Sequence, residues 1–309
     1  MRLGLIILKY FDLHCDTFLK IFEEGKDLSD PTLAVNVNDL GNIKTYVQQF
    51  AVYLSGKESD PKEYYKKVLS MGVSQLKKSN ISIIKTKNGL ETHNQTGGAA
   101  ALLAVEGGWF INSESDVENL CRDGIRTVSL CWNYDTPLAG GALQDGELTL
   151  LGMDVIRCLN RYNIALDVSH LNRKSFYKAV SIAENVVATH SGVDAIVKHP
   201  RNLADEQLKL IKDKNGVVGL CFYPLFAGSM PIDGIIRATD HALNLGLADN
   251  ISFGSDFDGA DMGIELSSVQ DVSNLYKRMH EFFSKPIVSK IFFENSYIFY
   301  SKVLTNTEI

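Results

Sequence analysis

Eight short apolar runs recur along the 309-residue chain, and they limit its fold more than any other feature. Continuous runs of Val, Ile and Leu are what a parallel sheet buried on both faces requires. They lie at residues 5–13, 49–54, 100–105, 126–131, 164–168, 186–189, 217–222 and 251–254. Segments with one apolar helical face lie between them at residues 61–79, 151–162, 174–184, 203–212 and 232–245. Eight strand–helix units predict an α/β fold of the (β/α)8 TIM-barrel type, with a doubly wound open sheet as the alternative.

The chain shows no long Pro, Gly or Ser linker, no internal repeat and no low-complexity tract. These absences predict one domain over residues 1–309 instead of separable modules. Residues 25–41 and 134–147 do not follow the strand or helix periodicity, and we expect them to form loops. Residues 268–304 are predicted to be helical and to close the outer layer.

Charge and cysteine content narrow the classes of partner. With 31 Lys and Arg against 37 Asp and Glu, the chain has a formal net charge of −6 and no basic block, which argues against nucleic acid and membrane partners. The apolar run at residues 3–8 is too short for a secretory signal or a bilayer span. Five cysteines without a close pair predict no disulfide framework and indicate a reducing, cytoplasmic setting.

Polar side chains follow five of the apolar runs at the point where each run ends. His14 and Asp16 stand two residues apart, so on an extended strand they face the same side. The other four residues that follow runs in this way are Glu106, His170, His190 and Asp256. Singly, each has an ordinary structural explanation, such as a hydrogen-bonded histidine, a helix N-terminal acid or a turn former. In a barrel, however, all six would face one mouth.

A cluster of buried carboxylates predicts bound cations. Asp16, Glu106 and Asp256 would repel one another and lose hydration at the mouth unless positive charge neutralised them. Nitrogen and oxygen ligands without thiolates favour zinc, with manganese, cobalt or iron as substitutes. The ligands outnumber those of one tetrahedral ion, so the pattern predicts two ions about 3.5–4 Å apart that share Glu106.

Six strings place these residues in a recognisable order. They are FDLHCDT (11–17), AVEGG (104–108), LDVSH (166–170), ATHSG (188–192), HPRN (199–202) and FGSDFDG (253–259). Together they resemble the membrane (renal) dipeptidase family of zinc peptidases, from about residue 11 to residue 301. The resemblance implies a distorted (β/α)8 barrel of the amidohydrolase superfamily, two zinc ions, and hydrolysis of dipeptides, including those with a C-terminal D-residue.

The resemblance also implies roles for individual residues. The family's metal ligands match five positions, with two for the first zinc, one bridging and two for the second: His14 and Asp16, Glu106, and His170 and His190. Asp256 matches the family's acid/base carboxylate. Arg201 matches the arginine that binds the free carboxylate of the substrate, which a planar guanidinium does with paired hydrogen bonds.

One position departs from the family. Trp132 stands where vertebrate-type members carry a histidine that binds the substrate carbonyl, and an indole donates one hydrogen bond without carrying charge. Stabilisation of the oxyanion would then rest on the metal ions, or on Asn133 if it faces the site. Tyr223 and Asp258 are expected to line the cavity. The C-terminal TNTEI lacks a hydrophobic anchor tail, as in bacterial members without a membrane anchor, and a homodimer is compatible with the resemblance.

The sequence therefore predicts a binuclear zinc dipeptidase in which a water bridging the ions attacks the amide and Asp256 carries the proton. A small dipeptide is the expected partner. The alternatives are another binuclear hydrolase acting on lactones, phosphoesters or N-acyl amino acids, and a metal-binding barrel without activity.

Overall fold

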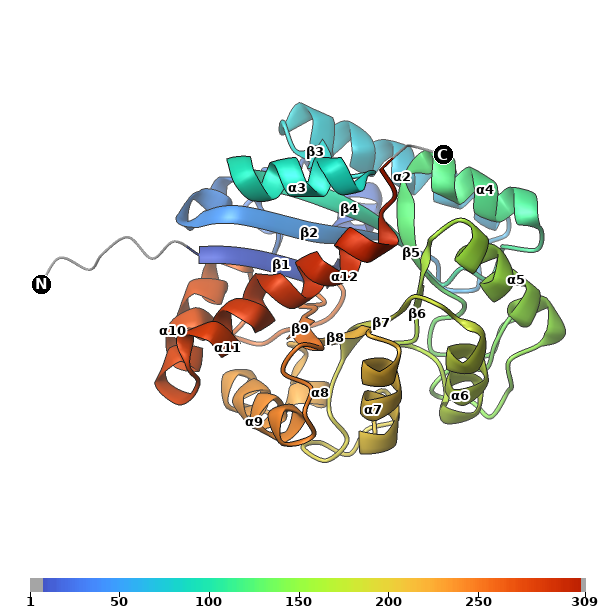
Figure 1. Ribbon diagram of the computed structural model, residues 1–309. Helices are drawn as coiled ribbons and strands as arrows, with labels where there is room; N and C mark the ends of the chain where they lie inside the picture. The colour runs from blue at the N-terminus through green and yellow to red at the C-terminus, as the bar shows by residue number, and fades with distance from the viewer. Residues whose placement is uncertain (1–7, 307–309) are drawn as a thin grey trace, which may run out of the picture.

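The computed structural model describes residues 8–306, and within them eight parallel strands close into a barrel surrounded by helices (Figure 1). The barrel strands are β1 (Leu8–Cys15), β2 (Ile43–Tyr53), β4 (Gly98–Glu106), β5 (Ile125–Ser129), β6 (Ala165–Asp167), β7 (Val186–Ser191), β8 (Val217–Leu220) and β9 (Ile251–Phe253). Every predicted apolar run overlaps one of them, and residues 5–7 of the first run lie outside the described residues. The TIM-type barrel is confirmed and the open sheet is wrong, because β1 pairs with β9 and β2 with β4.

Two features of the sheet differ from the prediction. Strand β2 begins six residues earlier than the apolar run, because Thr45 and Gln48 interrupt the apolar pattern yet are buried. A short strand, β3 (Ser82–Ile83), pairs with the beginning of β4 and is too short to leave a periodic signal. The barrel is distorted, since its strands range from eleven residues in β2 to three in β6 and β9.

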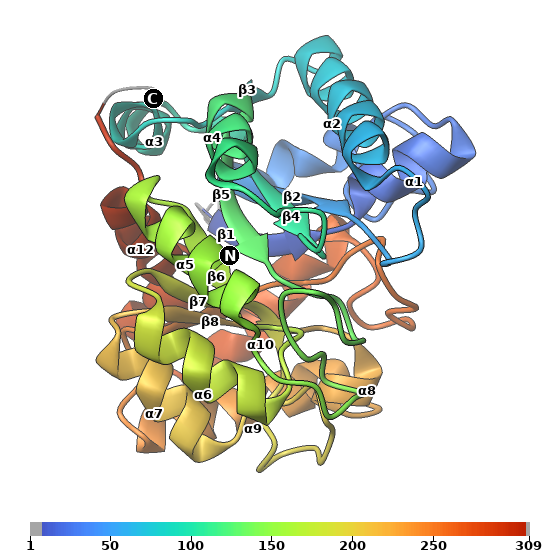
Figure 2. The same ribbon diagram turned by 90° about the vertical axis from the view of Figure 1, so that its right-hand side faces the viewer.

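Helices cover the outside of the barrel (Figure 2). They are α1 (Thr17–Glu24), α2 (Pro61–Lys78), α3 (Lys87–Thr96), α4 (Glu114–Asp123), α5 (Leu150–Arg161), α6 (Arg173–Ile182), α7 (Asp205–Asp213), α8 (Pro224–Ala227), α9 (Pro231–Asn244), α10 (Val272–Phe282), α11 (Lys285–Ser289) and α12 (Asn295–Val303). The five predicted helices correspond to α2, α5, α6, α7 and α9. Residues 134–147 contain no helix, whereas the loop predicted at residues 25–41 ends in a 3-10 turn, η1 (Val37–Asn42).

Local signals explain where several helices begin. The Asp60 side chain accepts a hydrogen bond from the Glu63 N–H at 3.0 Å, and Pro61 supplies the first residue of α2. The Asn172 side chain caps α6 in the same way, at 2.9 Å from the Ser175 N–H. The C-terminal part, predicted to be helical, contains α10, α11, a π-helical turn η3 (Lys290–Glu294) and α12, preceded by a 3-10 turn η2 (Val269–Asp271).

Helix α12 closes one end of the barrel, the end that faces the viewer in Figure 1. The Tyr300 hydroxyl donates to Gln49 Oε1 at 2.5 Å, and Thr127 Oγ1 donates to the same oxygen at 3.1 Å. The Tyr300 ring also stacks on Phe11, with ring centroids 5.6 Å apart. All four side chains are buried, so this end of the barrel is filled by packed and hydrogen-bonded groups.

The seam between the first and last strands is narrow, and both backbone and side-chain hydrogen bonds hold it. Strands β1 and β9 share a single residue pair, Asp12 with Phe253. Asp12 Oδ1 also accepts the Ser255 N–H at 2.9 Å, and Ser255 Oγ donates to the His14 carbonyl at 3.1 Å. The seam therefore places residues just after β9 beside residues at the end of β1.

No helix within residues 8–306 combines the length and the apolar character needed to cross a bilayer.

Candidate metal centre

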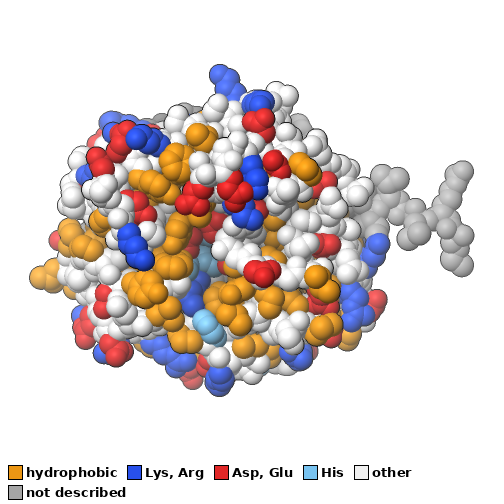
Figure 3. Space-filling model, turned by 180° about the vertical axis from the view of Figure 1, so that it is seen from behind, with side chains coloured by type: hydrophobic (Ala, Val, Ile, Leu, Met, Phe, Trp, Pro, Cys, Tyr) orange, Lys and Arg blue, Asp and Glu red, His pale blue; other side chains and the backbone are white. Residues whose placement is uncertain are grey.

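The carboxyl ends of the strands surround a cavity of about 420 Å³ on the face opposite α12. Figure 3 shows this face, with a hollow where acidic, histidine and basic side chains lie among hydrophobic ones. The cavity lining includes Asp16, Glu106, His170, His190 and Asp256. The barrel thus directs residues from distant parts of the chain to one place, as parallel strands with a common direction do.

Backbone position explains how each predicted ligand reaches the cavity. His14 lies in β1, Glu106 is the last residue of β4 and His190 lies in β7. The remaining three lie just beyond strand ends: Asp16 directly before α1, His170 after β6 and Asp256 after β9. All six residues are at least nine-tenths buried.

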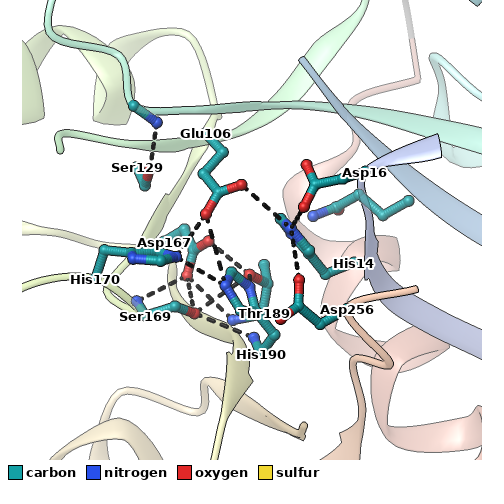
Figure 4. Close-up of polar contacts among 12 residues, drawn as sticks. His14, Asp16, Glu106, Ser129, Asp167, Ser169, His170, Thr189, His190 and Asp256 are labelled. Atoms are coloured by element: carbon teal, nitrogen blue, oxygen red, sulfur yellow. Dashed lines mark hydrogen bonds and ion pairs between the residues drawn. The ribbon is translucent and has the colours of Figure 1, made fainter. Parts of the chain in front are cut away.

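The first group of side chains consists of His14, Asp16 and Glu106, which offer ligand atoms within 4.8 Å of one another. His14 Nε2 lies 3.5 Å from Asp16 Oδ2 and 3.4 Å from Glu106 Oε2. Asp256 Oδ1 is 3.8 Å from the same nitrogen, on another side of it (Figure 4). The first group thus joins one imidazole to two carboxylates, with a third carboxylate beside it.

The second group consists of Glu106, His170 and His190. Glu106 Oε1 lies 2.5 Å from His170 Nε2 and 3.6 Å from His190 Nε2, and the two Nε2 atoms are 2.8 Å apart. Figure 4 shows Glu106 between the two groups, with one oxygen toward each. The structure therefore brings together all five predicted metal ligands, with Glu106 as the residue that the two groups share.

The donor set fits divalent cations. His14 Nε2, Asp16 Oδ1 and Glu106 Oε2 are buried without a hydrogen-bond partner in the described chain. Buried polar atoms without a partner are costly, and a bound cation would provide one for all three. Imidazole and carboxylate donors without thiolate match zinc and other borderline divalent ions.

The two groups shift the pKa of their histidines in opposite directions. Burial alone would lower the pKa of His14, but the Glu106 and Asp16 carboxylates outweigh it and raise that pKa well above the ordinary value. Burial and the Arg201 guanidinium lower the pKa of His170 to about 4. Burial, together with His14 and His170, holds the pKa of His190 well below its usual range.

The pKa values of the three carboxyl groups also shift in different directions. Burial would raise the pKa of Glu106, yet His170 and His14 hold it well below the ordinary value. Burial and the Glu106 charge raise the pKa of Asp16 to about 6. Burial, assisted by Asp16 and Glu106, raises the pKa of Asp256 to about 8, although His14 opposes this. Of these three carboxyl groups, Asp256 therefore holds its proton most strongly near neutral pH.

The loop after β9 gives Asp256 an unusual backbone. Asp256 and Asp258 adopt left-handed conformations, with φ of 65° and 67°. A Cβ at Gly259 would collide with the carboxylates of Asp16 and Asp256, so this position favours glycine. Asp258, which we expected to line this cavity, lines a neighbouring pocket instead. Its carboxylate accepts from Thr17 Oγ1 at 2.6 Å and from the Ala34 N–H at 2.9 Å, so it ties this loop to α1 and to the loop at residues 25–41.

Arg201 lies buried against the second group. Its Nη2 donates to His170 Nε2 at 3.0 Å and to the His190 carbonyl at 3.3 Å, and its guanidinium lies 5.3 Å from the Phe226 ring centroid. Within residues 8–306 its Nε and Nη1 groups have no hydrogen-bond partner, although Arg201 lines the cavity. Two unpaired N–H donors at a cavity are suited to an anionic group.

Three further residues that the sequence predicted at the site line the cavity, namely Trp132, Asn133 and Tyr223. The Trp132 ring lies 5.5 Å from Tyr53 and 6.2 Å from His170, centroid to centroid. Asn133 Oδ1 lies 2.9 Å from His170 Nδ1, so this oxygen is engaged by a histidine. Tyr223 packs edge-on against Phe226 at 5.1 Å.

Sequence reasoning missed four residues close to the site. Cys221 Sγ lies 3.9 Å from Asp256 Oδ2, and Tyr53 forms part of the cavity wall. Asp167 and Thr189 lie behind His190, joined by a 2.6 Å hydrogen bond. A signal existed for Asp167, because a charged residue inside a buried apolar strand needs a polar partner. No comparable signal marked Tyr53 or Cys221.

Comparison with known proteins agrees with this geometry. The model of the membrane dipeptidase family, peptidase family M19, matches residues 6–308. The chain therefore belongs to the membrane dipeptidase family, which confirms the resemblance seen in the six motifs. The family places it among metal-dependent enzymes that hydrolyse peptide bonds, as the sequence predicts.

Curated relatives share about a third of the aligned residues. An uncharacterized protein in the pqqA 5′ region of Klebsiella pneumoniae is 32% identical over 195 residues, which are 57% of this chain and 71% of that protein. An uncharacterized dipeptidase of Schizosaccharomyces pombe is 31% identical over 59% of this chain, and dipeptidase tcpJ of Claviceps purpurea is 29% identical over 58% of it. The matches span only 47% and 44% of these two fungal proteins.

Solved structures share the fold over nearly the whole chain. The crystal structure of the dipeptidase AC, a metallo peptidase, has a TM-score of 0.85 at 22% identity and covers 97% of this chain and 99% of its own. A metallo peptidase from Rhodobacter sphaeroides, liganded with a phosphinate mimic of the dipeptide L-Ala-D-Ala, has a TM-score of 0.84 at 22% identity, over 95% of this chain and 98% of its own.

Proposed function

We propose that this chain is a binuclear zinc dipeptidase that hydrolyses small dipeptides, with Asp256 as the proton carrier. The observation that carries the proposal is the placement of Glu106, which directs one carboxylate oxygen toward His14 and the other toward His170. The names of the fungal relatives support dipeptide substrates. Manganese, cobalt or iron would suit the same donors as substitutes for zinc.

Five residues would hold the two ions, namely His14, Asp16, Glu106, His170 and His190. When bound, two zinc ions would polarise the scissile carbonyl and lower the pKa of water. Asp256 lies beside the first group and faces the cavity, and burial raises the pKa of its carboxyl to about 8. A carboxyl with a pKa near the working pH can take a proton from the attacking water and return it to the leaving amine.

Arg201 would fix the other end of the substrate. Its unpaired Nε and Nη1 groups can bind the free carboxylate of a dipeptide with two hydrogen bonds. Because the same guanidinium contacts His170, the carboxylate would lie close to the metal groups. This short span favours dipeptides over longer peptides.

Residues of the cavity wall would make further contacts with the substrate. Trp132 and Tyr223 would contact substrate side chains, whereas Asn133 contacts His170 through its oxygen and would have only its amide N–H2 left for the oxyanion. The phosphinate mimic of L-Ala-D-Ala bound to the Rhodobacter sphaeroides protein makes L-Ala-D-Ala the first substrate to test for a C-terminal D-residue.

A cytoplasmic location, a homodimer and a single domain over residues 1–309 stay predictions.

The variant Asp256→Asn tests the proposed mechanism. We expect it to retain zinc and to lose turnover of L-Ala-D-Ala by about 10³-fold, since the amide cannot carry the proton. Elemental analysis and steady-state rates, each with and without a chelator, give the answer. Asp249→Asn is the control, because Asp249 is an exposed carboxylate paired with Lys290. Near-normal turnover in Asp256→Asn would contradict the role of Asp256 as proton carrier. Bound zinc in a wild-type protein that hydrolyses no amide would identify a metal-binding barrel without activity.

The variant Arg201→Ala tests the substrate class. We expect KM to rise by about 100-fold for dipeptides with a free carboxylate, which corresponds to the loss of a paired, charge-assisted interaction. C-terminally amidated dipeptides should be affected far less. Zinc content is measured alongside, because Arg201 also contacts His170. An equal loss on both substrates would contradict the carboxylate contact.

A further inference from the structure

His190 of the second group is backed by a hydrogen-bond chain that runs away from the cavity. His190 Nδ1 lies 2.9 Å from Thr189 Oγ1, and Thr189 Oγ1 lies 2.6 Å from Asp167 Oδ2 (Figure 4). Asp167, Thr189 and His190 are all buried. The chain crosses from β7 to the neighbouring strand β6, so it depends on the pairing of these two strands.

The direction of each hydrogen bond in this chain follows from counting protons. Asp167 Oδ1 accepts the Ser169 N–H at 3.0 Å and the Ser169 hydroxyl at 2.6 Å, and it also lies 3.1 Å from the Thr189 N–H. Surrounded by donors, the carboxylate can only accept, so the Thr189 hydroxyl gives its single proton to Asp167 Oδ2. Thr189 Oγ1 therefore has lone pairs left, but no proton, for His190.

The consequence concerns the tautomer of His190. Because Thr189 Oγ1 can only accept at this contact, His190 Nδ1 must carry the proton, which leaves Nε2 with a free lone pair. That lone pair faces Glu106 and His170 in the second group. The Ser169 hydroxyl adds to the restraint, because it accepts the backbone N–H of His190 at 3.1 Å.

We infer that Asp167, acting through Thr189, is a positioning residue that fixes His190 in the Nδ1–H tautomer and so presents Nε2 as a metal ligand. The inference rests on the proposed function for the identity of the metal, but the tautomer itself does not depend on it. The Nδ1–H tautomer also fits His170 by a separate route, since its Nδ1 lies 2.9 Å from Asn133 Oδ1, an oxygen that can only accept. Outer hydrogen bonds of this kind typically change metal affinity 10- to 100-fold.

The experiment compares Thr189→Val with Thr189→Ser. The valine variant keeps the shape of the side chain and removes the acceptor, whereas serine keeps the hydroxyl. We expect Thr189→Val to bind one of two zinc equivalents about 10- to 100-fold more weakly in competition with a chelator, and Thr189→Ser to restore wild-type binding. The turnover lost in Thr189→Val should return at excess zinc, because Thr189 does not touch the reacting atoms.

Thr239→Val is the matched control. Thr239 is a fully buried threonine in α9, and its hydroxyl has no hydrogen-bond partner among residues 8–306. It should leave both zinc affinities unchanged. Thermal unfolding of each metal-free variant checks that the fold is retained.

Imidazole nitrogen NMR on the metal-free protein separates this inference from the proposed function. The wild type should show His190 protonated at Nδ1, and Thr189→Val should show a mixture or the Nε2–H form. If the protein bound no zinc but these spectra were found, the proposed function would fail and the positioning role would stand. Equal zinc affinity in Thr189→Val, or an Nε2–H tautomer in the wild type, would overturn the inference.

Discussion

The two groups of candidate metal ligands lie in one cavity and share Glu106, yet the pKa values of their histidines shift in opposite directions. All three imidazoles are buried, but the pKa of His14 is raised while those of His170 and His190 are lowered. Carboxylates surround His14, whereas Arg201 and a second imidazole accompany His170. Burial alone therefore does not decide the direction of the pKa shift of a histidine; the balance between burial and all the nearby charges does.

This difference predicts different metal chemistry in the two groups. A cation entering the first group must displace a proton from His14, whereas the second group already presents neutral imidazoles whose outer nitrogens are held by Thr189 and Asn133. The second group is thus preorganised, and the first is coupled to pH.

The largest expected effect comes from removing what the two groups share. Glu106→Gln keeps the shape of the side chain but removes the negative charge from both groups, so we expect zinc to be lost from both and kcat/KM to fall by at least about 10⁴-fold. Zinc analysis and rates on L-Ala-D-Ala measure this. His190→Ala should instead affect mainly one zinc equivalent. If Glu106→Gln kept two equivalents, the two groups would not be joined through this residue.

The second prediction concerns pH and sharpens the contrast. Zinc binding to the first group should weaken by about tenfold per pH unit below the pKa of His14, because one proton competes with the ion, and further as Asp16 protonates near pH 6. Binding to the second group should change little above pH 5, because the pKa of His170 is about 4 and that of His190 lies well below its usual range. Titration calorimetry in buffers of different ionisation enthalpy, on His14→Ala and His190→Ala, counts the protons released. Equal proton release by both variants would remove the distinction.

The smallest expected effect concerns the stability of the metal-free protein. The pKa of Asp256 is raised from 3.8 to about 8 in the folded protein, so the folded state holds its proton more strongly than the unfolded state does. Stability should then be unaffected by Asp256 below pH 4 and should fall as the pH rises toward 8. Asp256→Asn avoids this cost, and its Tm should exceed that of the wild type by ~5 °C or more at pH 8, with no difference near pH 4. Thermal unfolding at both pH values in chelator is the measurement, and a lower Tm for the variant at pH 8 would contradict it.

The sequence was sufficient for the ligands but not for their surroundings. His14, Glu106 and His190 could be predicted because each stands at the end of an apolar run and parallel strands bring those ends together. The Asp167–Thr189 contact depends on the pairing of β6 with β7 and on side-chain direction, which no local pattern encodes. Likewise, the contact between Asn133 and His170 joins residues 37 positions apart in loops without periodicity.

The fold prediction had similar limits. Apolar runs located the strands, but α3 was not predicted, because Leu90 is its single buried residue among those described. The early start of β2 was missed because Thr45 and Gln48 are polar, although the barrel buries them. Periodicity therefore reports elements that pack by apolar contact, and it loses those that pack through polar groups.

The narrow seam between β1 and β9 makes the proposed proton carrier depend on the order of synthesis. His14 and Asp256 lie 242 positions apart along the chain, on the two sides of that seam, whereas the five proposed metal ligands all lie between residues 14 and 190. A ribosome-bound chain that ended before β9 would already contain every ligand of both groups. The first group would acquire its neighbouring acid only when the final strand arrived, so the last residue of the site to be made is the one proposed to carry the proton.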